Sequence, residues 1–323
     1  MLSLCFLVSS FIFCNILIFF LLPILRLRFL DIPNCRSSHS LPTPRGGGLV
    51  FVFITIIASI ISLFNSSQFL LSPSYFLLAP LFCLPLAIVG FIDDLFSLPS
   101  RLRFIVQSFT SLVVVFTSPL LNFSPSSVLL FCLALVLFVA VVNFVNFLDG
   151  LDGLVAGCMS VVITSSIYIL DLSPPFWALS GSLLAFLAWN WSPAKVFMGD
   201  VGSTFLGAIF GFLVIHASSL SQSLALLLLA TPLLADAFSC VVRRAIHGQQ
   251  IFQPHRLHLF QRLHQAGFSH SIVSSVYILS TLILVITYLF GGLSLLVLAS
   301  SIIILFGYAL DNFVAVSFRS ACD

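Results

Sequence analysis

Long apolar runs, interrupted by short polar stretches, make up most of this chain. Many of the runs reach about 20 residues, the length of α-helix that crosses the hydrocarbon core of a bilayer. Taking each run as one span predicts an all-α polytopic membrane protein with about eleven transmembrane helices, and about ten as the alternative. The spans leave no room for a soluble unit, so we expect residues 1–323 to form a single integral membrane domain. The predicted helices are centred near Phe13, Ile57, Pro85, Val113, Leu135, Val162, Leu184, Phe210, Leu228, Leu282 and Ile303.

The composition agrees with this pattern. Hydrophobic residues account for 60% of the sequence and charged residues for only 7%. A water-soluble protein of this composition would expose large apolar surfaces, so a soluble protein is excluded. The net charge of +2 is too small to indicate nucleic acid binding. The eight cysteines form no CxxC pair and lie mostly within the apolar runs, which favours apolar packing over a disulfide framework or a metal site.

The basic residues determine the predicted orientation. In the layout with eleven spans, all twelve Lys and Arg residues fall on one side of the membrane. Cytoplasmic loops carry an excess of Lys and Arg, so this side is predicted to be cytoplasmic, with the N-terminus outside and the C-terminus inside. The alternative, a cleaved signal peptide at the start of the chain, lacks the positively charged beginning of such peptides.

All ten acidic residues are Asp. Acids beside apolar helix ends are energetically costly and are functional candidates for that reason. For Asp171, Asp311 and Asp323 we expect only solvated helix ends. The seven candidates in or beside the predicted cytoplasmic loops are Asp31, Asp93, Asp94, Asp149, Asp152, Asp200 and Asp236.

The adjacent pair Asp93 and Asp94 ends the third predicted span. Two neighbouring carboxylates repel each other unless a cation or a proton neutralises them. A divalent metal would do so, and the alternative is pairing with Arg101 and Arg103, which follow closely.

A second polar motif ends the fifth predicted span. Asn143, Asn146 and Asp149 follow one another at steps of three and therefore share a broad helix face. Two glycines then break the helix and free Asp152. Oxygen ligands on a shared face suit a hard cation such as Mg²⁺. Asp200 lies between glycines at a later helix start, where a metal or a phosphate can approach the backbone.

Two loops supply cationic side chains. In the first, three prolines and a triple glycine accompany His39 and Arg45, a composition that favours a phosphate contact, although the glycines could equally provide a flexible entry into the next span. In the second, His255, His258 and Arg262 are spaced for one helical face, a comb of cations suited to a pyrophosphate. Two alternatives remain: a zinc site, disfavoured because no Cys or Glu accompanies the histidines, and a basic amphipathic helix on the membrane surface.

In this order, from Asp31 to about His270, the motifs resemble those of the polyprenyl-phosphate N-acetylhexosamine 1-phosphate transferase superfamily, glycosyltransferase family 4. The opening DIPNCRSSHSLPTPRGGG and the closing PHRLHLFQRL look most like the WbpL-like branch that initiates O-antigen synthesis. The run of adjacent histidines of the pentapeptide transferases is absent. Teichoic-type members usually have Asp where this chain has His255, and many members have Lys where it has Arg103.

Carried over by position, the resemblance implies that Asn146 and Asp200 hold Mg²⁺, with Mn²⁺ as an alternative. It implies that Asp152 meets the uridine, and that Asp93 and Asp94 face the lipid phosphate, Asp93 as an orienting group or a proton acceptor. The implied pyrophosphate-binding residues are His255, Arg256 and His258. Further implied substrate-binding residues are Asp149, Arg103, Arg45, His39 and Lys195.

The resemblance implies an enzyme of the bacterial inner (cytoplasmic) membrane. It would transfer N-acetylhexosamine 1-phosphate from a UDP-sugar to undecaprenyl phosphate, release UMP and start a lipid-linked glycan such as an O-antigen; a homodimer is an open alternative. An intramembrane prenyltransferase would need Asp clusters with wider spacing and leaves the glycine-rich and histidine-rich loops unexplained. A lipid-linked sugar transporter would line a path across the bilayer with polar groups, whereas the candidates here gather on one side.

Overall fold

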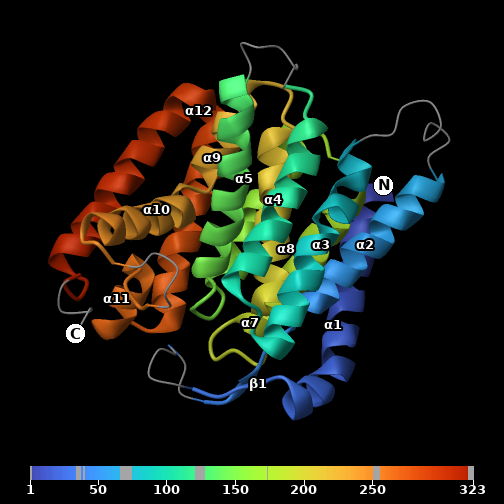
Figure 1. The fold of residues 1–323 in the computed structure, drawn as a ribbon, viewed down its shortest axis with the longest axis horizontal. Coiled ribbons are helices and arrows are strands. Elements are labelled where there is room, and N and C mark those ends of the chain that lie inside the picture. Colours follow the sequence, from blue (N-terminus) through green and yellow to red (C-terminus); the bar gives the residue numbers. More distant parts are fainter. Residues whose placement is uncertain are drawn as a thin grey trace.

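A computed structural model describes residues 2–33, 38, 41–65, 75–120, 128–172, 174–249 and 255–318, and most of these are α-helical. The chain runs back and forth between two ends of the molecule (Figure 1). Every predicted helix centre falls within a helix of the structure. The helices are α1 (Leu2–Arg28), α2 (Gly48–Asn65), α3 (Tyr75–Phe96), α4 (Ser100–Phe116), α5 (Val128–Phe147), α6 (Leu154–Ile169), α7 (Pro174–Asn190), α8 (Gly199–Ile215), α9 (Leu220–Leu229), α10 (Thr231–Ile246), α11 (Leu259–Gln265) and α12 (His270–Phe313).

Among the described residues, α1, α3, α5 and α12 are long and apolar enough to cross a membrane, and the bent pair of α9 and α10 adds a fifth if it counts as one span. Helices α2, α6 and α8 are apolar but shorter. The chain is therefore an all-α membrane protein, apart from a minimal antiparallel pairing of β1 (Leu30–Asp31) with β2 (Thr43–Pro44). The crossing of the bilayer by eleven helices stays a prediction.

The ninth predicted span differs from expectation because the helix breaks in its middle. Helix α9 ends at Leu229, and α10 leaves it at an angle of 80°. Pro232 has no N–H to continue the hydrogen-bond ladder, and the Thr231 hydroxyl donates to the Leu228 carbonyl that the ladder leaves open. As a result, α10 runs across the molecule instead of along it (Figure 1).

The last two predicted spans are the two halves of α12. They meet at Gly292, whose φ of 61° and ψ of −158° are not helical and belong to a region that only glycine adopts readily. The chain folds back there (Figure 1), so that Asp311, near the end of α12, contacts Arg262 of α11, which lies just before the start of α12.

Helix α8 forms the centre of the core: every residue from Val201 to Ile215 is buried. Helices α3 and α5 pack against it, and small residues allow the close approach that is typical of helices in membranes. A Cβ added to Gly90 of α3 would lie 2.5 Å from the Asp200 carbonyl oxygen. This packing brings the ends of α3 and α5 to the start of α8.

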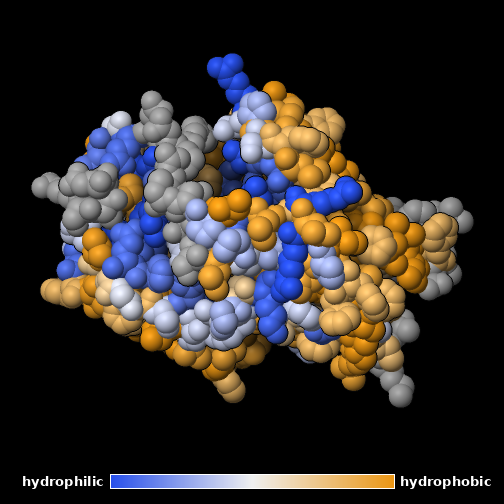
Figure 2. Space-filling model, turned by 90° about the horizontal axis from the view of Figure 1, so that it is seen from below, coloured by the Kyte–Doolittle hydropathy of each residue, from blue (hydrophilic) through white to orange (hydrophobic). Residues whose placement is uncertain are grey.

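Polar residues gather at one end of the molecule, which we call the polar end. There α1, α3, α5 and α7 end, and α2, α4, α6 and α8 begin. The view from below, in Figure 2, shows hydrophilic surface collected on this end, with hydrophobic surface around it. Basic side chains occur in the last turns of α1 and α10.

Candidate active site

The polar end holds a cluster of four carboxylates and one amide, the acidic region, made of Asp93, Asp94, Asp149 and Asp200 with Asn146. The amide nitrogen of Asn146 donates to Asp200 Oδ1 and to Ser203 Oγ, at 2.9 Å each. The end of α5 and the start of α8 are thereby joined. The structure thus places the two predicted metal-binding residues side by side.

Asp94 caps α8 from a neighbouring helix. Its two carboxylate oxygens accept the backbone N–H groups of Asp200, at 3.1 Å, and Val201, at 3.2 Å. A negative charge at a helix N-terminus is favourable because the exposed N–H groups carry partial positive charge. Gly199, with a φ of 74°, makes room for this contact, since a Cβ there would lie 2.6 Å from Asp94 Oδ2.

Asp93 is paired with an arginine, one of the two alternatives that the sequence leaves open. Arg103 Nη1 lies 2.7 Å from Asp93 Oδ2 and 3.6 Å from Asp200 Oδ2. The second oxygen of Asp93 accepts the N–H of Leu98. Arg103 therefore bridges the end of α3 and the start of α8, while both oxygens of Asp93 have donors.

Asp149 follows α5 and faces the other carboxylates. Burial, and then the neighbouring carboxylates led by Asp200, raise the pKa of Asp149 to about 8. Without a balancing cation, the Asp149 carboxyl therefore keeps its proton at neutral pH. A buried group of carboxylate and amide oxygens fits Mg²⁺, which prefers such hard donors.

Asp152 and His270 form a second pair in the same place. Asp152 Oδ1 lies 3.2 Å from His270 Nδ1, and Oδ2 accepts the N–H of Ala194 at 3.2 Å. Burial alone would raise the pKa of Asp152, but His270 and the Ala194 N–H hold it below its usual value. His270 had no assigned role in the sequence because the only signal was its place at the start of an apolar run.

A cavity of about 210 Å³ connects these groups at the polar end. It unites segments that are far apart in the sequence, from the first loop to the start of α12. Its lining includes Asp31, Arg45, Asp94, Asp149, Asp152, Asn190, Asp200, Gln261 and His270. Five of the predicted site residues therefore line one cavity, and Asn146 donates a hydrogen bond to one of these five, Asp200.

The basic region comprises residues 255–265 together with Arg243 and Arg244. The expectation of one helical face is wrong here, because α11 begins only at Leu259 and His258 precedes it with extended φ and ψ. Burial, and then the proximity of His258 and Arg244, lower the pKa of His255 to about 3. His255 is therefore neutral at pH 7 and is not part of a comb of cations.

Asp236 of α10 caps α11 as Asp94 caps α8. Its oxygens accept the N–H groups of Leu259, at 2.8 Å, and Phe260, at 3.2 Å, and the hydroxyl of Tyr277, at 2.8 Å. His258 Nδ1 lies 3.6 Å from Asp236 Oδ1. The His258 ring is also 6.4 Å from that of Phe147, the last residue of α5. The basic region is thus held close to the acidic one.

Arg262 does not point to a substrate site. Its side chain is buried, and its guanidinium is bound to the carboxylate of Asp311 and to two backbone carbonyl oxygens. The side chain of Asp311 is likewise covered, with 8% exposed, which corrects the expectation of a solvated helix end. Asp171 is exposed as expected, and Asp323 lies outside the described residues.

A cysteine does accompany the histidines. Ligand atoms of Cys240, His255 and His258 lie within 4.8 Å of one another in the described structure. This group was not visible in the sequence, because Cys240 comes from α10, well before residues 255–258, which we call the histidine loop. Arg244 lies close enough to His255 to lower its pKa, and the same positive charge opposes a dication, so a zinc site remains disfavoured.

The other predicted contacts have mixed outcomes. Gly47 and Gly48 donate their N–H groups to the carbonyl oxygens of Phe197 and Met198, at 2.9 Å each, so these glycines pack against the segment before α8 instead of meeting an anion. Lys195 is exposed, with its Nζ 5.3 Å from the centre of the Trp189 ring. His39 lies outside the described residues.

Comparisons with known proteins identify the family of this chain. The family model for glycosyl transferase family 4 matches residues 75–218. The undecaprenyl-phosphate alpha-N-acetylglucosaminyl 1-phosphate transferase of Thermotoga maritima is 33% identical over 72% of this chain and 73% of the relative. The protein of the same description from Salmonella typhimurium is 29% identical over 81% and 77%. The phospho-N-acetylmuramoyl-pentapeptide-transferase of Clostridium perfringens is 31% identical over 85% and 94%. With such identity over most of both chains, this protein belongs to glycosyl transferase family 4.

Proposed function

We propose that this protein transfers N-acetylhexosamine 1-phosphate from a UDP-sugar to undecaprenyl phosphate and releases UMP. The names of its relatives support the lipid acceptor and the 1-phosphate transfer. The observation that carries the proposal is the convergence of Asp94, Asp149, Asp152 and Asp200 on one cavity at the polar end. An apolar acceptor with a phosphate head reaches such a cavity from the surrounding bilayer.

The reaction is an in-line attack by a phosphate oxygen of the lipid on the phosphorus that bears the sugar. The new bond joins the two phosphates, the bond to the UMP oxygen breaks, and the glycosidic bond stays intact. A phosphate monoester has its second pKa near 6, so the attacking oxygen is already largely ionised at pH 7. A strong general base is unnecessary, and positioning with charge neutralisation supplies most of the catalysis.

Asn146 and Asp200 would hold Mg²⁺, and when bound it would neutralise charge on the phosphates. The raised pKa of Asp149, caused by burial and then by the neighbouring carboxylates, supports this assignment, because a bound cation would let that carboxyl ionise. Arg103 orients Asp93 and reaches toward Asp200. Because both oxygens of Asp93 already accept hydrogen bonds, we assign it an orienting role toward the lipid phosphate.

We assign the donor, the UDP-sugar, to the part of the cavity beside Asp152 and His270. The Asp152 carboxylate, fixed by His270 and by the Ala194 N–H, would accept a hydrogen bond from a uracil N–H. Arg256 supplies positive charge to the pyrophosphate, and His255 and His258 supply hydrogen-bond donors beside it. The excess of basic residues at the polar end supports a cytoplasmic position for the site, in the inner membrane of a bacterium. We assign the product to O-antigen synthesis on the sequence motifs alone.

The test uses the purified protein with undecaprenyl phosphate, Mg²⁺ and a panel of UDP-N-acetylhexosamines, and measures UMP release together with radiolabelled lipid. We expect lipid product that requires Mg²⁺ and is lost in Asp200→Asn. Asp171→Asn is the matched control, because Asp171 is exposed and lies beyond α6 at the opposite end of the molecule. Folded protein that gives no product with any donor would overturn the proposal.

A further inference from the structure

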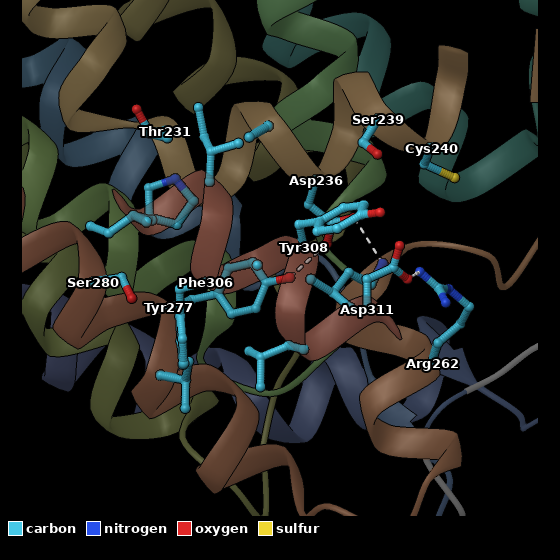
Figure 3. A pocket seen from close by; sticks show the side chains of 18 of the residues that line it. Thr231, Asp236, Ser239, Cys240, Arg262, Tyr277, Ser280, Phe306, Tyr308 and Asp311 are labelled. Carbon is cyan, nitrogen blue, oxygen red and sulfur yellow. Dashed lines mark hydrogen bonds and ion pairs between the residues drawn. The ribbon is translucent and has the colours of Figure 1, made fainter. Parts of the chain in front are cut away.

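A second cavity, of about 170 Å³, lies between α10, α11 and the two halves of α12. Figure 3 shows its lining, with apolar side chains such as Phe306 along most of it and a charged group at one end. The charged group consists of Asp311, Arg262 and Arg243. None of the residues assigned to the transfer reaction above belongs to this group.

Asp311 joins two elements of the basic region. Its side chain is 8% exposed, and one oxygen pairs with Arg262 of α11 while the other pairs with Arg243 in the last turn of α10. One carboxylate therefore separates two guanidinium groups that would otherwise repel each other. Buried charges of this kind are held in place by their partners, and loss of one partner leaves the others uncompensated.

Residues after α12 complete the enclosure of Arg262. Its Nη1 donates to the Val316 carbonyl oxygen at 2.8 Å. The Phe318 ring lies 5.6 Å from the Arg262 guanidinium and 5.7 Å from that of Arg243, within the range of a cation–π contact. The side chain of Arg262 is 3% exposed. Residues 311–318 thus form a clamp, named the C-terminal clamp, around one arginine.

Arg262 passes this constraint to the histidine loop. Its Nε donates to the Leu257 carbonyl oxygen at 3.1 Å. Leu257 stands between Arg256 and His258 and is itself buried. Because residues 255–258 have no helix of their own, their position depends on such tertiary contacts. The path from Asp311 through Arg262 to Leu257 is continuous.

We propose that Asp311 is a positioning residue for the transfer reaction, which fixes the histidine loop through Arg262 at the distance needed to bind the donor pyrophosphate. This rests on the function proposed above. Both oxygens of Asp311 pair with arginines, so we assign it no direct contact with either substrate. Its loss lets Arg243 and Arg262 move apart and lets residues 255–258 drift from their position near α5.

The test combines kinetics with hydrogen–deuterium exchange on the full chain. Asp311→Asn is expected to lower kcat/KM for the UDP-sugar by about tenfold to a hundredfold, because misplacement of binding groups by about 1 Å has effects of this size. The change should fall mainly on KM for the donor, with KM for undecaprenyl phosphate within about twofold. Exchange should rise in residues 255–265. Asp311→Glu keeps the charge and should restore most of the activity, and Asp171→Asn should change nothing.

The exchange measurement separates this inference from the proposed function. Faster exchange confined to residues 255–265 supports the clamp even if no donor is ever turned over. Unchanged exchange and unchanged donor KM would overturn it, as would a uniform rise in exchange over the whole molecule. If Asp311→Asn does not fold, Phe318→Leu removes the ring and keeps the charges. It should give a smaller rise in the same segment, and no rise there would count against the clamp.

Discussion

The acidic and the basic regions share one structural feature, a helix capped by an Asp of another helix, but they differ in how their charges are balanced. In each, an Asp from a neighbouring helix caps the start of another helix through two backbone N–H groups: Asp94 caps α8, and Asp236 caps α11. In the acidic region burial, and then the neighbouring carboxylates, raise the pKa of Asp149. In the basic region Asp236 and Asp311 are fully engaged by donors. The proposed function assigns a cation to the first region, whereas the charges of the second are paired within the protein.

The two capped helices also differ in what else supports them. Helix α8 is 17 residues long and buried from Val201 to Ile215, so core packing holds it. Helix α11 has only seven residues, and a helix of this length is unstable alone. Removing an acid should therefore harm catalysis in the acidic region and stability in the basic one.

The largest effect is expected for Asp200→Asn. Loss of this charge should reduce kcat by about 100- to 1,000-fold, as removal of one preorganised electrostatic group does. Because one of several repelling carboxylates is gone, the melting temperature in EDTA should stay equal or rise. UMP release and a thermal melt measure the two quantities. A fall of several degrees in the melting temperature would contradict repulsion between these carboxylates.

Asp236→Asn should show the reverse pattern. Asp236 is buried and accepts from Leu259, Phe260 and Tyr277, and an amide replaces charged acceptors by weaker ones. We expect about 2 kcal/mol lower stability, the typical worth of a hydrogen bond to a charged group. Thermal or denaturant unfolding of the detergent-solubilised protein measures this. Tyr277→Phe, which removes one donor only, should lose less, and equal losses would argue against this ranking.

The pH dependence should separate the regions as well. The pKa of Asp149 is raised to about 8, so without a divalent cation its contribution to stability is lost as the pH rises between about 4 and 8. The pKa of His255 is lowered to about 3, so its contribution is lost as the pH falls from about 6.5 to 3. A plot of melting temperature against pH should be flatter between about pH 4 and 8 in Asp149→Asn, and flatter between about pH 3 and 6.5 in His255→Gln. Interchanged effects would refute the comparison.

The smallest effect is expected for Arg103→Lys. Lysine keeps the positive charge but lacks the planar guanidinium that reaches Asp93 and Asp200 together. The Arg103 side chain is 35% exposed, so screening limits the loss to about two- to fivefold in kcat/KM. Steady-state kinetics at low and high salt measure it. Arg103→Gln should lose more, and a larger loss with lysine than with glutamine would exclude a role for the charge.

Much of the helical framework could be predicted from the sequence because apolar runs are a local signal. Each predicted centre lies in a helix. The break before α10 also had a local signal, the Thr231-Pro232 pair, which the hydropathy of the run concealed. The acidic region was predictable as a set of residues, since carboxylates beside apolar helix ends are rare, but the capping role of Asp94 depends on where α3 meets α8.

The basic region was harder to predict because its contacts join distant parts of the chain. Asp311 looked like a solvated helix end, and only the return of α12 brings it to Arg262. Cys240 lies near the histidines because α10 turns across the molecule. Arg262 matched the spacing of a substrate-binding comb, yet its guanidinium is occupied by protein groups. Spacing along the sequence does not reveal which charges a fold neutralises.

The break at Gly292 allows all 44 residues of α12 to lie within the thickness of a membrane. As one straight helix, the 44 residues of α12 would extend about 66 Å, more than twice the hydrocarbon thickness of about 30 Å. Half of that rod would project into water with its leucines and isoleucines exposed. One residue with a non-helical backbone instead gives two lengths that each match the bilayer, and it returns the last turn to the side on which the first began.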